Sequence, residues 1–176
     1  MELQPTPVNA PNQNQAALAQ AKFILTARAR RGTDWFFWIA GLSLINTVIN
    51  LVGGQLSFVT GLGIMQLIDG LTIGFAKNAS ANGGLVIHVI GFAINALIAL
   101  MFVLAGFLSR KRYRWIVIAG MLIYALDGLV FILFQDWIPL LFHGWALWGL
   151  WNGLKAINDL KKLEESNQTI GITPSF

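Results

Sequence analysis

Cysteine is absent from the 176-residue chain. Its absence excludes disulfides, thiolate metal sites and the dithiol chemistry of membrane thiol and quinone oxidoreductases. The sequence also lacks a Ser–His–Asp arrangement with motif support, an HExxH motif and a phosphate-binding loop. We therefore expect a protein that is not an enzyme and that holds neither a metal nor a cofactor.

Charged residues are scarce, at 11% of the chain, whereas soluble domains contain about a quarter. Hydrophobic residues make up 56%, and the mean hydropathy is +0.63. So few ionic groups cannot cover a water-facing surface, so we expect one all-α domain with the lipid bilayer as its main partner. The net charge of +4 comes from basic residues that flank apolar runs. Because they form no stripe interleaved with aromatic residues, we expect no nucleic-acid partner.

The pattern of apolar runs divides the chain into segments. Residues 1–15 are rich in Pro, Asn and Gln and predict a disordered tail. Residues 16–34 are typical either of an amphipathic helix on the membrane surface or of a solvated juxtamembrane linker, and both interpretations stay open. The first apolar run begins only at Trp35, so we expect it to be an uncleaved anchor. Four runs approach the roughly 20 residues that a membrane span needs: 35–53, 85–108, 115–134 and 138–154.

A fifth run, 56–76, is long enough to cross but contains four glycines together with Gln66 and Asp69. Glycine weakens a helix interior by about 1 kcal/mol. Three basic clusters decide whether this run crosses, since Lys and Arg near span ends prefer the cytoplasm. The clusters are Arg28/Arg30/Arg31, Arg110/Lys111/Arg112/Arg114 and Lys155/Lys161/Lys162.

All three clusters are cytoplasmic if the chain crosses four times, whereas a fifth crossing moves the second cluster to the outside. We therefore predict a membrane-embedded four-helix bundle at 35–157, with 56–76 as a re-entrant or interfacial helix on the non-cytoplasmic side. Both termini, including the polar tail 158–176, are then cytoplasmic in a multi-pass protein of the cell (inner or plasma) membrane. A fifth span with Asp69 buried is the alternative.

Asp127 is the one acidic residue within the four predicted spans, which contain no Lys or Arg. It lies ten residues before Trp137, or about 15 Å at 1.5 Å per residue, which is close to the bilayer midplane. Asn95 and Asn46 reach a similar depth on two other spans. We predict that Asp127 is protonated and hydrogen bonded to Asn95 or Asn46. An intramembrane acid is also a functional-site candidate by default, so both a structural and a titrating role are retained.

Two histidines, His88 and His143, lie near the outer ends of their spans. With Gln66 and Asp69 they predict a second polar layer that opens toward the non-cytoplasmic face. We expect both rings to be structural, because each is close enough to the interface to reach water. The alternative role, as paired axial ligands of a haem, has no further support in the sequence.

The sequence GLWNG, at Gly149–Gly153, has the small-xxx-small spacing of close helix contacts. Gly149 and Gly153 are therefore candidate packing positions, within the chain, in a homo-oligomer or with a partner in a membrane complex. Trp145, Trp148 and Trp151 recur every three residues along the same run, which predicts a lipid-facing or packing stripe.

The stretches WFFWIAGLSLINTVI, SFVTGLGIMQLIDG and RWIVIAGMLIYALDGLVFILFQDW resemble small bacterial multi-span membrane proteins to which no activity is assigned. The resemblance covers most of residues 35–157 and implies an integral membrane location without implying a catalytic residue. Two functional hypotheses follow. One is a non-catalytic accessory or scaffolding membrane protein. The other is a small proton-linked carrier that uses Asp127, with Asn46 and Asn95 as partners and His143 at the outer mouth.

Overall fold

The computed structural model describes residues 13–52 and 61–169. Within these ranges the chain forms six α-helices and no strand, which confirms the all-α prediction. The helices are α1 (Gln13–Thr33), α2 (Trp35–Leu51), α3 (Gly63–Lys77), α4 (Ala81–Arg110), α5 (Arg114–Leu133) and α6 (Trp137–Thr169). Residues 1–12 of the predicted tail lie outside the described residues, and residues 13–15 begin α1.

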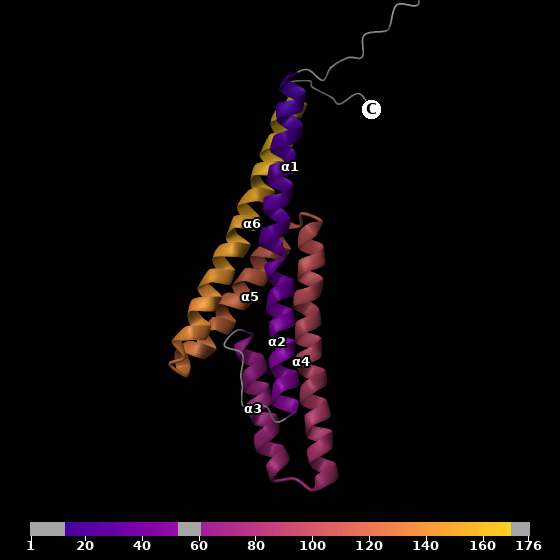
Figure 1. Ribbon diagram of the computed structural model, residues 1–176, viewed down its shortest axis with the longest axis vertical. Helices are drawn as coiled ribbons and strands as arrows, with labels where there is room; N and C mark the ends of the chain where they lie inside the picture. Colours follow the sequence, from indigo (N-terminus) through magenta and orange to yellow (C-terminus); the bar gives the residue numbers. More distant parts are fainter. Residues whose placement is uncertain (1–12, 53–60, 170–176) are drawn as a thin grey trace, which may run out of the picture.

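The helices α1 and α2 follow one another almost on one axis (Figure 1). Asp34 joins them because it has helical backbone angles and its N–H donates to the carbonyl of Arg30 at 2.8 Å. In Figure 1, α2 and α5 run down the bundle and α4 and α6 run up it, whereas α3 begins near mid-height and runs down beside α4. The turn between α4 and α5 lies next to the α1–α2 junction, where Arg110 and Asp34 form an ion pair of 2.6 Å.

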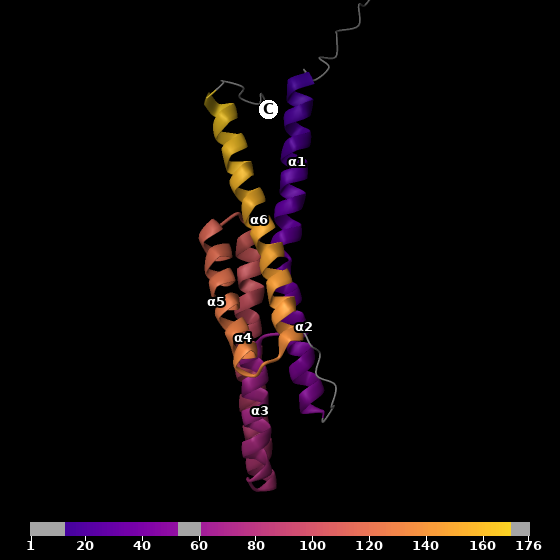
Figure 2. The ribbon, with the colours of Figure 1, turned by 90° about the vertical axis from the view of Figure 1, so that its left-hand side faces the viewer.

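The helices α1 and α6 extend together beyond the α4–α5 turn (Figures 1 and 2). We expected the last span to end at residue 154 and a polar tail to begin at 158, but α6 continues to Thr169. Ala156, Ile157 and Leu160 explain the difference, because all three are buried and pack with Ala29 in one apolar cluster. Residues 16–34 form most of α1, which packs along α6. Neither the surface-helix nor the linker interpretation of this segment included that contact.

Three helical segments among the described residues are long and apolar enough to cross a membrane: Gln13–Leu51, Ala81–Arg110 and Arg114–Leu133. Their outer faces carry large apolar side chains that no other part of the described chain covers. On α4, for example, Leu85, Leu97 and Met101 are each more than half exposed. A surface of this kind is suited to lipid rather than water, which indicates a membrane protein.

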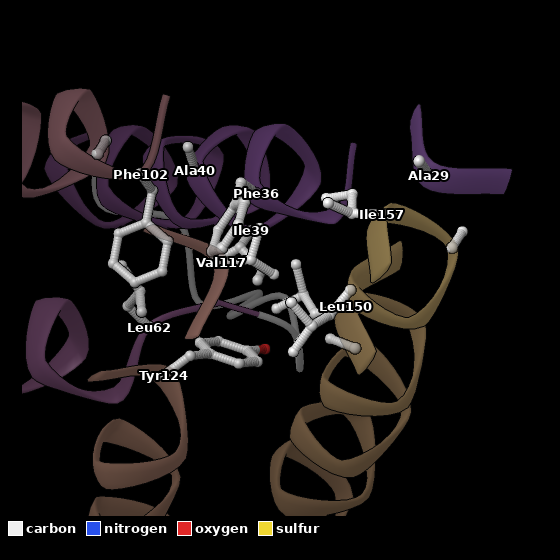
Figure 3. Close-up of a cluster of buried hydrophobic side chains, with 14 of the residues drawn as sticks. Ala29, Phe36, Ile39, Ala40, Leu62, Phe102, Val117, Tyr124, Leu150 and Ile157 are labelled. Carbon is white, nitrogen blue, oxygen red and sulfur yellow. The ribbon is translucent and has the colours of Figure 1, made fainter. Parts of the chain in front are cut away.

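The apolar core lies where α2 meets α5 and α6. Figure 3 shows Phe36 and Ile39 of α2 gathered with Val117 and Tyr124 of α5 and Leu150 of α6. All five side chains are buried. This core fixes the rotation of α5 and α6, and therefore the directions in which their polar side chains point.

Glycines bring α6 against the α1–α2 junction. A Cβ atom on Gly153 would lie 2.9 Å from Cα of Gly32, and one on Gly149 would collide with the indole of Trp35. The structure thus places the predicted packing glycines in a helix contact within the chain. Trp35 also meets Trp145 edge to face, with ring centroids 4.8 Å apart.

Candidate functional site

The carboxylate of Asp127 binds the first turn of α3. Its Oδ2 atom accepts a hydrogen bond from the N–H of Gly63 at 2.7 Å, and its Oδ1 atom accepts one from the N–H of Ile64 at 2.9 Å. The preceding N–H, of Leu62, donates to Oγ of Ser43 in α2 at 2.8 Å. Leu62 has an extended backbone and no capping side chain of its own, so side chains from α5 and α2 satisfy the N–H groups at this helix start. The positive end of the helix dipole also favours a carboxylate there.

His143 of α6 is the third partner of Asp127. Its Nε2 atom lies 3.0 Å from Oδ2 of Asp127, and its Nδ1 atom lies 2.9 Å from the carbonyl oxygen of Pro139. A carbonyl only accepts hydrogen bonds, so Nδ1 carries a proton. Nε2 and Oδ2 therefore share a further proton, either as imidazolium and carboxylate or as imidazole and carboxylic acid. Both arrangements leave the buried pair neutral overall, which lowers the cost of placing it in a membrane.

The imidazole of His143 is held in place on both sides. The ring of Tyr124 stacks on it, with centroids 4.1 Å apart and planes 13° apart, and Phe131 packs against it at 5.1 Å. Gly128 leaves room for the ring, since a Cβ atom there would lie 3.2 Å from Cδ2 of His143. The hydrogen-bonding direction of the imidazole is therefore fixed by apolar packing.

A second polar cluster surrounds Asp69 of α3 and links it to α2 and α4. Oδ1 of Asp69 accepts a hydrogen bond from Nδ2 of Asn95 at 2.6 Å. Its Oδ2 atom accepts one from Oγ1 of Thr47 and one from Nδ2 of Asn50, both at 3.1 Å. Asn95 also donates to Oγ1 of Thr47 at 3.0 Å. The three helices are thus joined through one buried carboxylate whose hydrogen-bond donors are all neutral side chains.

A cavity of about 10 Å³ lies beside this cluster. That volume is about what one water molecule needs. It is lined by Thr47, Asn50, Leu51, Asp69, Thr72, Ile73, His88 and Phe92. His88 is half-buried and borders the same space as Asp69.

The predicted layer of Asn46, Asn95 and Asp127 is rearranged in the structure. Asn95 is buried as expected, but its amide donates to Asp69 and Thr47, while Asp127 binds His143 and α3. Asn46 is also buried, with its amide nitrogen next to Gly61. The prediction from depth was wrong about the partner of Asn95 because depth along a helix does not set its rotation, and because α3 itself supplies donors to Asp127.

The other sequence candidates are divided between separate places. His143 contacts Asp127, and His88 lies at the Asp69 cavity, so the two rings belong to different clusters. Asp69, expected in an outer helix, is buried between α2 and α4. Gln66 lines a larger cavity of about 440 Å³ between α3 and α5, together with Asp136.

Sequence reasoning missed Ser43 and Thr47. Ser43, Asn46, Thr47 and Asn50 are spaced i, i+3, i+4 and i+7, so they share one face of α2. This polar stripe within an apolar run is the signal that predicts a face turned toward other polar groups rather than toward lipid.

In residues 13–52 and 61–169, no group of three or more His, Cys, Asp or Glu side chains is arranged to hold a metal ion. Comparison of the chain with protein-family models, curated proteins and solved structures gave no match.

Proposed function

We propose that the chain is a polytopic cell-membrane protein that crosses the bilayer four times, through α2, α4, α5 and α6, with α3 re-entering from the non-cytoplasmic side. The ion pairs support this topology, because they gather the basic clusters at one end of the bundle. Nη2 of Arg110 lies 2.6 Å from Oδ1 of Asp34. Nη1 of Arg112 lies 2.7 Å from Oε1 of Glu164. A common cytoplasmic location of these clusters satisfies the positive-inside rule.

Within this topology we propose a non-catalytic accessory or scaffolding role. The observation that carries the proposal is the hydrogen bonding of Asp127. Each oxygen of its carboxylate is bound by a backbone N–H of α3, and one of them also by His143. A carboxyl group that loads and releases a ligand exchanges partners, whereas this one holds the start of a helix in place.

Reconstitution into proteoliposomes tests the role of Asp127. Proton uptake is followed with a trapped pH-sensitive dye while a potassium gradient and valinomycin impose a membrane potential. The scaffolding role predicts the same uptake for wild type, Asp127→Asn and protein-free liposomes, with less folded protein recovered for Asp127→Leu. Wild-type uptake that Asp127→Asn abolishes, at equal amounts of folded protein, would overturn the proposal.

A second candidate, a proton-linked carrier, is favoured by one feature of the Asp69 cluster. The carboxylate of Asp69 is buried, and within the described residues it has no ion pair, unlike Asp127 with His143. A water-sized cavity and His88 lie beside it. The same assay tests this candidate, since a carrier predicts uptake by wild type that Asp69→Asn removes and that Asp136→Asn, at an exposed position, leaves unchanged.

A further inference from the structure

A groove runs between α1 and α6 at the end of the bundle where the basic clusters lie. Its volume is about 570 Å³. Phe23, Ile24 and Ala27 of α1 form an apolar wall, and the indoles of Trp35 and Trp148 form the end nearer the bundle. Phe23 is 75% exposed and Trp148 is 64% exposed. These surfaces are therefore open to whatever surrounds the protein at the membrane boundary.

Two arginines, Arg28 and Arg31, line the same groove one helical turn apart on α1. Both are exposed, and no carboxylate among residues 13–52 and 61–169 pairs with either of them. Other arginines at this end, Arg110 and Arg112, do have carboxylate partners. The groove therefore combines two uncompensated positive charges with an apolar wall, which is an amphiphilic site rather than a purely ionic one.

We propose that this groove binds an anionic phospholipid of the cytoplasmic leaflet. Arg28 and Arg31 hold the phosphate, because guanidinium groups form short, charge-assisted hydrogen bonds to phosphate oxygens. The apolar wall and the two indoles contact the glycerol and the first part of an acyl chain. Trp favours this depth in a bilayer, and basic pockets between helices on the cytoplasmic side are suited to anionic head groups. The inference uses the proposed membrane topology but is independent of the roles of Asp127 and Asp69.

Native mass spectrometry of the full chain, released from a neutral detergent, tests the site with phosphatidylglycerol and phosphatidylcholine as probes. Wild type is expected to retain phosphatidylglycerol in preference to phosphatidylcholine. The double variant Arg28→Gln/Arg31→Gln is expected to bind phosphatidylglycerol about thirtyfold more weakly, from about a fivefold loss for each basic residue. Ala27→Trp keeps the charges but fills the groove, and it is expected to lose binding as well.

The control variant Lys111→Gln/Arg114→Gln removes the same charge at the same end of the bundle, outside the groove, and is expected to bind like wild type. An equal loss in this control would overturn the proposal, because it would show general surface attraction. Equal retention of both lipids by wild type would also overturn the proposal. Glycerol phosphate without acyl chains is expected not to displace the lipid, and full displacement would show a free-phosphate site instead. None of these outcomes depends on the number of membrane crossings.

Discussion

The Oδ2 atom of Asp127 lies 3.0 Å from Nε2 of His143 and also accepts the N–H of Gly63 at 2.7 Å. One carboxylate therefore connects α5 with α6 and with the start of α3. Because all of these groups are buried in an apolar surrounding, each bond that is lost leaves a polar atom without water to replace it.

Asp127→Asn removes one acceptor while keeping the shape of the side chain. Because each carboxylate oxygen accepts an N–H of α3, the amide nitrogen of the variant faces one of those N–H groups in either orientation. We expect the free energy of unfolding to fall by about 1–3 kcal/mol, the cost of an unsatisfied buried polar group. Unfolding in mixed micelles titrated with SDS measures the change. Asp136→Asn is the matched control, since Asp136 is exposed in the α5–α6 turn, and an equal effect there would contradict the assignment.

His143→Phe keeps a ring that can stack on Tyr124 and pack against Phe131 but removes the bond to Asp127. We expect Asp127→Asn to cost less in this background than in wild type. The coupling energy from a double-mutant cycle is expected at about 0.5–3 kcal/mol, as for groups in direct contact. Strictly additive losses would show that the two side chains do not act as a pair.

Asn95→Ala deletes the amide that joins Asp69 and Thr47 across three helices. Interhelical polar bonds in membranes contribute about 0.6 kcal/mol on average and up to about 1.7. We expect a loss near the upper value, because Asn95 makes more than one bond and is fully buried. Asn82→Ala, on the exposed first turn of the same helix, should leave the free energy of unfolding unchanged. A neutral Asn95→Ala would argue against the cluster.

Gly153→Ala adds a methyl group where α6 touches Gly32 of α1. The helices must separate to admit it, so we expect a loss of about 1–3 kcal/mol, as for overpacked cores. Gly144→Ala is the control on the same helix, because a Cβ atom there meets nothing within 4 Å. Alanine is the better helix former by about 1 kcal/mol, so this control should be neutral or stabilising. Thermal unfolding in detergent distinguishes the two variants.

Apolar runs predicted three of the helices within a few residues, because length and hydropathy are local properties. The extent of α6 was not predictable in the same way. Its last part is polar in composition, and Ala156, Ile157 and Leu160 are buried only because α1, far away in sequence, lies beside them. A contact between segments so far apart in the sequence cannot be predicted from the local pattern of apolar residues.

The polar site was predictable in its residue types but not in its pairing. Asp127 and Asn95 were recognised because acids and amides within apolar runs are costly in lipid. Their partners depend on helix rotation, at 100° for each residue, and on where the start of α3 lies. Backbone N–H groups at a helix start have no signature in a sequence, so the bonds from Gly63 and Ile64 to Asp127 became visible only in three dimensions.

Single-cysteine labelling tests the proposed topology, in which α3 turns back without crossing the membrane. The chain has no cysteine of its own, so Lys77→Cys, Lys111→Cys and Ser166→Cys each report one position to a membrane-impermeant maleimide. We expect labelling of Lys77→Cys in intact cells, and of Lys111→Cys and Ser166→Cys only in inverted vesicles. Labelling of Lys111→Cys and Ser166→Cys in intact cells, with Lys77→Cys protected there, would show that α3 crosses the membrane and would contradict the proposed topology.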